Sequence, residues 1–159
     1  MSHGLHEYHT GLTWTGNTGT GTSGYRSYER AHELTAPDGK PTIQGSSDPA
    51  FRGDKSRWSP EDLLVASLSA CHMLSFLHRA SLAGVNVVEY TDAASGTMKQ
   101  TSDGGGSITD VVLHPVVTVQ TADMAELCEQ LHDEAHARCF IANSVAFTVR
   151  HEATVRVLD

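Results

Sequence analysis

The most prominent hydrophobic pattern in the chain is a long apolar run that begins near residue 59. Ser59 suits a helix N-cap, Pro60 suits the first helical position, and two acidic residues follow where the helix dipole favours negative charge. Apolar side chains then cover nearly every side until Gly84, a residue typical of C-terminal caps. The pattern predicts a helix over 59–84 that must be buried in a core or in an oligomer interface.

A second helix is predicted over residues 122–138, where apolar residues recur at helical spacing opposite a charged face. Residues 145–157 place apolar side chains at odd positions and polar ones at most even positions, which predicts one half-buried strand. Between the two helices, the strand-like segments VNVVEY, TMKQ and ITDVVLHPVVTV and the turn cluster SDGGGS predict a hairpin.

The N-terminal part of the chain is polar and rich in glycine. Its first fifty residues predict two strands joined by a flexible hairpin loop, and residues 35–58 are predicted to form a long loop with several prolines. The order of elements is therefore strands, helix, strands, helix, strand. It predicts an α+β fold, with a mostly antiparallel sheet and both helices on one face, in a single domain over residues 1–159.

The charge, the first residues and the cysteine content of the chain limit the partners and the location that we expect. The chain has 11 basic and 19 acidic residues, a formal net charge of −8, which argues against nucleic acid or an anionic membrane surface as its main partner. The first residues lack the basic and apolar regions of a signal peptide, and we expect no membrane span. Three widely spaced cysteines are unlike a secreted disulfide framework, so we expect a cytoplasmic protein.

Two of these cysteines are candidates for thiol chemistry. Cys71 lies in the middle of the first predicted helix, where most cysteines are buried apolar residues, and a thiolate there needs a cation brought in by the tertiary structure. Cys139 lies where the second helix should end. A cysteine at that position can resolve an oxidised partner by forming a disulfide, or it can simply anchor the helix end. The residues alone leave both interpretations open.

A metal site is the alternative for the second helix. Cys128, His132 and His136 stand at positions i, i+4 and i+8, and adjacent turns of a helix can supply two metal ligands. The outer two residues are about 12 Å apart along the axis, so they cannot both reach one ion without a bend. We therefore expect no metal and no cofactor, with Cys128 in the core and both histidines solvated.

Residues 59–77, SPEDLLVASLSACHMLSFL, resemble the motif of the OsmC/Ohr family of thiol-dependent hydroperoxide reductases, in which Asn/Ser-Pro-Glu precedes the first cysteine within a helix. Residues 135–145, AHARCFIANSV, resemble the family's second-cysteine segment, and WTGNTGTGTSGYRSY and DPAFRGDKSRWSPEDL extend the similarity over most of the chain. The resemblance implies an OsmC-like fold, an intertwined α+β homodimer whose two central helices per subunit pack between sheets, with active sites at the subunit interface.

The resemblance also implies roles for individual residues. Cys71 matches the peroxidatic cysteine, whose thiolate attacks an organic hydroperoxide and becomes a sulfenic acid. Cys139 matches the resolving cysteine, which forms an intrasubunit disulfide that an external thiol, a lipoyl or other dithiol, reduces. Glu61 matches a glutamate that holds an arginine over the thiolate. We expect this arginine to be Arg52; the other candidates are Arg26, Arg30 and Arg57.

Two points of the resemblance need a structural answer. His72 departs from the family pattern, because an aromatic or apolar residue often follows the first cysteine; it could tune the thiolate or line the interface. On one straight helix Glu61 and Cys71 would be about 15 Å apart, too far to share an arginine directly. Either the helix breaks between them, or they come from different subunits. The alternative function is a non-catalytic dimer that binds a small apolar ligand at its interface.

Overall fold

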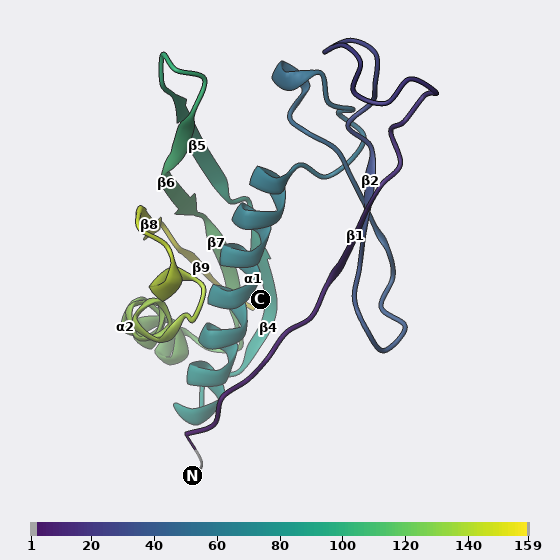
Figure 1. Ribbon diagram of the computed structural model, residues 1–159. Coiled ribbons are helices and arrows are strands. Elements are labelled where there is room, and N and C mark those ends of the chain that lie inside the picture. Colours follow the sequence, from purple (N-terminus) through teal and green to yellow (C-terminus); the bar gives the residue numbers. More distant parts are fainter. Residues whose placement is uncertain (1–2, 159) are drawn as a thin grey trace. The chain divides into compact units, whose positions relative to one another are not determined.

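The computed structural model describes residues 3–158, and the chain divides into two compact units, Met1–Leu63 and Leu64–Asp159 (Figure 1). The first unit contains a three-stranded antiparallel sheet in the order β1-β2-β3. Its strands are β1 (Gly11–Trp14), β2 (His32–Thr35) and β3 (Ile43–Gly45). The hairpin predicted in the first fifty residues is confirmed by β1 and β2, whereas β3 lies in a segment predicted to be a loop. The single domain over 1–159 stays a prediction.

The second unit combines helices with two three-stranded sheets, whose strand orders are β4-β7-β9 and β5-β6-β8. Helices α1 (Pro60–Leu82) and α2 (Ala122–Arg138) confirm both predicted helices, and most of α1 belongs to this unit. The strands are β4 (Val87–Asp92), β5 (Ser95–Gln100), β6 (Gly106–Leu113), β7 (Pro115–Val119), β8 (Thr148–His151) and β9 (Thr154–Val157).

Two segments predicted as continuous strands are each divided in the structure. The segment ITDVVLHPVVTV forms β6 and β7, which separate at His114 and join different sheets. Residues 145–157 form β8, which pairs with β6 in parallel, and β9, which pairs with β7 in parallel. The prediction of a single strand over residues 145–157 is therefore wrong. Apolar and polar side chains alternate through both β8 and β9, although the backbone passes from one sheet to the other between them. Antiparallel pairing still predominates, and β5 and β6 form the predicted hairpin.

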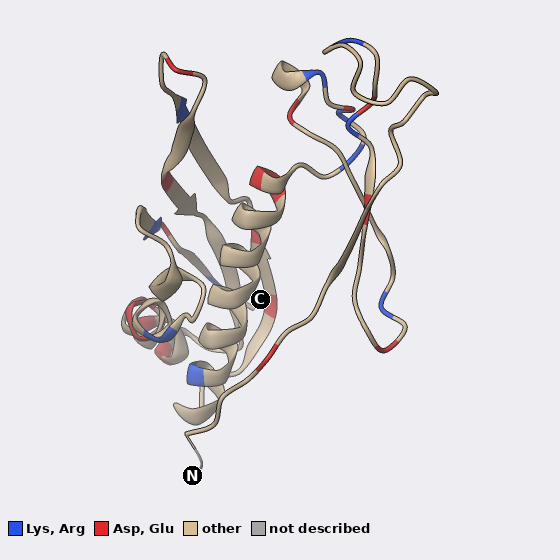
Figure 2. Cartoon of the chain, in the orientation of Figure 1, with Lys and Arg blue, Asp and Glu red and all other residues tan. Residues whose placement is uncertain are grey.

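Both ends of α1 follow from local signals. The backbone N–H of Asp62 donates to Ser59 Oγ at 3.1 Å, and the N–H of Ser59 donates to Asp62 Oδ2 at 3.0 Å, a reciprocal capping arrangement. Gly84 follows the helix with a φ of 74°, a left-handed conformation that glycine adopts without strain. Figure 2 shows charged residues only near the two ends of α1, so its middle is free to pack against apolar groups.

Two hydrophobic clusters hold the second unit together. The larger one packs Phe76 and Ala80 of α1 against Val117 of β7 and Leu131 of α2. The smaller one joins α1 to β6 and β8, and its buried members are Leu68, Val111, Leu113 and Val149. Because α1 contributes to both clusters, it fixes the positions of the two sheets of this unit around a single helix.

Only one stripe of α1 is buried within the described part of the chain. The buried residues are spaced four apart and are Leu68, His72, Phe76 and Ala80. On other faces, Leu74 and Leu82 are 63% and 64% exposed. By length and composition alone α1 could cross a membrane, which the sequence prediction did not anticipate, although core helices of soluble proteins pass the same test. The sequence predicted that nearly every side of this helix is buried. Within the single chain, only one face of it is.

Candidate active site

Cys71 and Cys139 come together in the second unit, although 68 residues separate them in the sequence. Cys71 lies on α1, and Cys139 is the C-cap residue of α2, where the backbone becomes extended with φ −71° and ψ 110°. The Cys71 thiol lies near enough to Cys139 to raise the pKa of the Cys139 thiol, and both cysteines are free. The fold thus makes neighbours of the two cysteines that the proposed disulfide would join.

The two thiols have different surroundings. Cys139 is 1% exposed, and the N–H of Ala142 donates to its Sγ at 3.5 Å. Burial, followed by the contact with the Cys71 thiol, raises the pKa of Cys139 to about 11. Cys71 is only partly buried. At neutral pH, Cys139 therefore keeps its proton, and Cys71 is the thiol of the pair that is open to an incoming molecule.

Cys71 lines a cavity of about 560 Å³. Leu74 and Phe140, which is 83% exposed, supply large apolar surfaces beside it. The remaining lining residues are Ser75, His78, Arg79, Arg138 and Asn143. The cavity therefore suits a largely apolar molecule that brings a reactive group to the Cys71 sulfur.

Two arginines that the sequence prediction did not consider line this cavity. Arg79 is held by Glu134, to whose Oε2 its Nε donates at 2.9 Å and its Nη2 at 2.8 Å. Arg138 has no ion-pair partner among residues 3–158. A sequence signal for Arg138 existed, because it directly precedes Cys139, but the prediction looked for the cation only in the loops before α1. The packing of the end of α2 near the middle of α1 was needed to bring Arg138 to the same cavity as Cys71.

Arg52 and Glu61 belong to the first compact unit. Arg52 ends the short 3-10 helix Pro49–Phe51 in a left-handed conformation, φ 64°, and its guanidinium lies 6.0 Å from the centroid of the Tyr25 ring. Glu61 lies in the first turn of α1, and its Oε2 has no hydrogen-bond partner within the described part of the chain. The expected action of Arg52 and Glu61 on Cys71 stays a prediction.

Two of the other candidate arginines, Arg30 and Arg57, make contacts within the first unit. Arg30 donates to the carbonyl oxygen of Tyr28 at 2.6 Å, and its guanidinium lies 3.9 Å from the centroid of that ring. Arg57 donates to Gln44 Oε1 at 2.9 Å. These contacts engage the guanidinium groups of Arg30 and Arg57 within the first unit.

The helix that carries Glu61 and Cys71 is continuous from Pro60 to Leu82. The first of the two explanations offered for their separation, a break in the helix, is therefore wrong. Ten residues of unbroken helix place the two residues about 15 Å apart along the axis. The glutamate and the cysteine of one chain are thus too far apart along α1 to share an arginine directly.

The second helix also corrects one expectation about histidines. His132 is 1% exposed, not solvated, because its ring turns inward and stacks on Phe76 with centroids 4.0 Å apart. His72 is equally buried, and its Nε2 lies 2.9 Å from Nδ1 of His132. Cys128 is in the core, as predicted. Among residues 3–158, no group of three or more His, Cys, Asp or Glu side chains is arranged to hold a metal ion.

Comparison with known proteins agrees with this architecture. Residues 53–154 match the family described as OsmC-like protein. An OsmC-like protein of unknown function from Vibrio cholerae is 34% identical in sequence, with a TM-score of 0.83, and the match covers 94% of this chain and 99% of that one. No curated protein matches the chain.

Two further solved structures show likeness of fold alone. An organic hydroperoxide resistance protein from Elizabethkingia anophelis is 20% identical, with a TM-score of 0.69 and coverage of 99% of this chain and 100% of that one. The organic hydroperoxide resistance protein OsmC from Legionella pneumophila is 18% identical, with a TM-score of 0.70 and coverage of 96% and 98%. The family match covers well over half of the residues, so this chain belongs to the OsmC-like family.

Proposed function

We propose that this protein is a thiol-dependent peroxidase that reduces organic hydroperoxides to alcohols through Cys71 and Cys139. The observation that supports it most directly is that these two cysteines are neighbours, beside a cavity with large apolar surfaces. Two proteins of the same fold, from Elizabethkingia and Legionella, are organic hydroperoxide resistance proteins. The reduction of the hydroperoxide uses only the two protein thiols, so it needs no bound cofactor, and a reducing cytoplasm would favour their thiol form.

In the first step, the thiolate of Cys71 attacks the distal oxygen of the hydroperoxide. The S–O bond forms as the O–O bond breaks, and the leaving alkoxide takes up a proton to become the alcohol. Cys71 is thereby oxidised by two electrons to a sulfenic acid. An arginine over the sulfur would stabilise both the thiolate and the charge that develops on the leaving oxygen. We assign this role to Arg52, held by Glu61.

In the second step, the thiol of Cys139 attacks the sulfenic sulfur of Cys71. A disulfide forms within one subunit, and the sulfenic oxygen leaves as water with the proton of the Cys139 thiol. An external dithiol, such as a lipoyl group, then reduces the disulfide by thiol–disulfide exchange and returns both cysteines to the thiol form. The raised pKa of Cys139 fits a residue that stays protonated until the sulfenic acid has formed.

The active form in this proposal is a homodimer in which Glu61 of one subunit serves Cys71 of the other. The exposed apolar side chains of Leu74, Leu82 and Phe140 support a subunit interface, because apolar surface of this extent often marks a site of association. The continuous helix supports the exchange between subunits, since one chain cannot bring its own Glu61 to its own Cys71 along α1.

Turnover of cumene hydroperoxide tests the proposal. Purified wild type is compared with Cys71→Ser, Cys139→Ser and the control Cys128→Ser, using dihydrolipoamide and a monothiol as alternative reductants. We expect Cys71→Ser to lose at least a hundredfold in rate and Cys128→Ser to keep the wild-type rate, because Cys128 packs in the core away from the thiol pair. Oxidised wild type should contain the Cys71 to Cys139 disulfide. An unchanged turnover rate in Cys71→Ser would contradict the proposal.

The same experiment distinguishes the peroxidase from the alternative function, a non-catalytic dimer that binds a small apolar ligand in the cavity beside Cys71. That function gains support if no dithiol sustains turnover while Cys71 also resists alkylation by iodoacetamide at pH 7. Rapid alkylation of Cys71, together with turnover, favours the peroxidase.

A further inference from the structure

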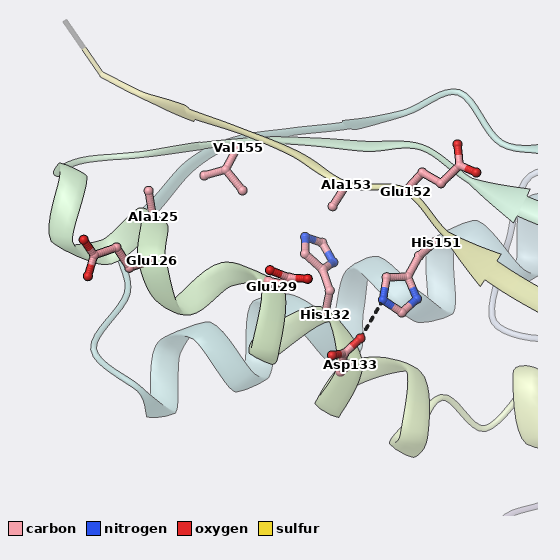
Figure 3. Close-up of a pocket in the computed structure, with 9 residues that line it drawn as sticks. All are labelled: Ala125, Glu126, Glu129, His132, Asp133, His151, Glu152, Ala153 and Val155. Atoms are coloured by element: carbon pink, nitrogen blue, oxygen red, sulfur yellow. Dashed lines mark hydrogen bonds and ion pairs between the residues drawn. The ribbon is translucent and has the colours of Figure 1, made fainter.

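A second cavity, of about 590 Å³, shares no lining residue with the one beside Cys71. It is open to solvent and is lined by α2, β8, β9 and the residues between these two strands (Figure 3). Its walls combine carboxylates, two histidines and small apolar side chains. The lining residues are Ala125, Glu126, Glu129, His132, Asp133, His151, Glu152, Ala153 and Val155.

The charge of this cavity is negative and partly uncompensated. Asp133 already pairs with His151 at 3.0 Å, and Glu152 pairs with groups outside the cavity. Glu126 and Glu129, one turn apart on α2, have no ion-pair or hydrogen-bond partner among residues 3–158. No lysine or arginine is among the described residues that line the cavity. Two carboxylates are therefore available to a cationic ligand.

A buried nitrogen points to a ligand at the same place. His132 is 1% exposed, lines the cavity, and has no hydrogen-bond partner for Nε2 in the described part of the chain. Figure 3 shows its ring extending from α2 toward Ala153 and Val155, beside Glu129. Burial lowers the pKa of His132 to about 3, so the ring is neutral at pH 7 and can accept a hydrogen bond. A buried polar atom left without a partner is unfavourable, and a ligand donor would relieve that cost.

The cavity walls also limit the kind of cation. Among residues 3–158, no group of His, Cys, Asp and Glu side chains is arranged to hold a metal ion, which favours an organic cation over a metal. Ala125, Ala153 and Val155 provide apolar contact for a hydrocarbon chain. A protonated primary amine carries three donors and no acceptor, and it therefore matches a site whose unpartnered groups can all act as acceptors.

We propose that this cavity binds a small aliphatic amine in its protonated form. The ligand carries one or more ammonium groups. These interact with Glu126 and Glu129 and donate to Nε2 of His132, while the alkyl chain lies against Ala153 and Val155. In the bound state, His132 carries its proton on Nδ1 and donates it to Nε2 of His72, which lies 2.9 Å away. Ligand binding thus selects one tautomer of a buried histidine pair.

Calorimetric titration of the full chain with 1,4-diaminobutane and spermidine tests the binding. We expect one site per chain, and at least a tenfold loss of affinity in Glu126→Gln/Glu129→Gln. The control Glu7→Gln/Glu33→Gln changes the net charge equally, outside the cavity, and should keep the wild-type affinity. Equal losses in both double variants would mean diffuse attraction to a chain of net charge −8, and absence of binding to wild type would also overturn the proposal.

Nitrogen NMR of the histidine rings gives a readout that does not depend on a variant folding. Saturation with 1,4-diaminobutane should leave Nε2 of His132 with the chemical shift of an unprotonated acceptor and Nδ1 with that of a protonated nitrogen. A protonated Nε2 in the saturated protein would contradict the assigned contact. None of these measurements involves Cys71, so they succeed or fail independently of the peroxidase activity.

Discussion

At the scale of single residues, His72 and His132 couple folding to pH. Burial is the main cause that lowers the pKa of His72 to about 4 and that of His132 to about 3, and neighbouring histidines lower both further. In the unfolded chain both titrate near pH 6.5. Below that value the unfolded state binds more protons than the folded state, so the free energy of unfolding decreases as pH falls from about 6.5 toward 4.

We therefore expect the protein to lose on the order of 2 kcal/mol of unfolding free energy per histidine between pH 7 and pH 5. Urea unfolding at the two pH values measures this loss. The double variant His72→Phe/His132→Phe replaces both rings with apolar rings of similar size, and it should show a much smaller loss. If the double variant is as sensitive to acid as wild type, the buried histidines are not the cause.

At the scale of elements, the N-terminus of α1 depends on Ser59, whose side chain accepts a hydrogen bond from the N–H of Asp62. Ser59→Ala removes this acceptor and should lower the free energy of unfolding by about 1 kcal/mol. Urea denaturation at pH 7 measures the change, with Ser23→Ala in an exposed loop as the control. Equal stability of the two variants would show that the cap contributes nothing.

The helices could be predicted closely because their signals are local. Capping residues, helical spacing and a terminal glycine each act within a few residues of the chain, and they predicted α1 and α2 nearly to their observed ends. The strands β8 and β9 could not be separated in this way. Val149 and Val155 both lie at inward positions of one alternating pattern, yet they pack in different hydrophobic clusters. The choice of sheet depends on pairing with β6 and β7, far away in sequence.

At the scale of the whole molecule, the exposed apolar face of α1 predicts self-association. We expect the wild type to elute as a dimer in size-exclusion chromatography with light scattering. Leu74→Glu places a charge on this face, where the side chain is 63% exposed in the single chain, and should shift the protein toward the monomer. Leu5→Glu, at a fully exposed position, serves as the control. A monomeric wild type would contradict the proposed assembly.

Mixed subunits test whether Glu61 acts across the dimer. Glu61→Gln and Cys71→Ser should each be poorly active alone. If the glutamate serves the partner's thiol, a heterodimer of the two variants contains one complete site, with Cys71 from the first chain and Glu61 from the second. The heterodimer, purified from co-expressed variants, should then recover up to half of the wild-type peroxide turnover. No recovery in a purified heterodimer would place both residues in the same subunit's site.

The sequence by itself determined the two helices, the hairpins, the α+β class and the pair of cysteine motifs, because all of these are written in short stretches of chain. Only the tertiary structure decided which side chains meet. It made Cys71 and Cys139 neighbours, placed Arg138 in the wall of the cavity beside Cys71, and turned His132 inward to pair with His72. These contacts join residues about sixty or more positions apart, and they form only when the packing of α1 and α2 in one core fixes which of their faces are opposed.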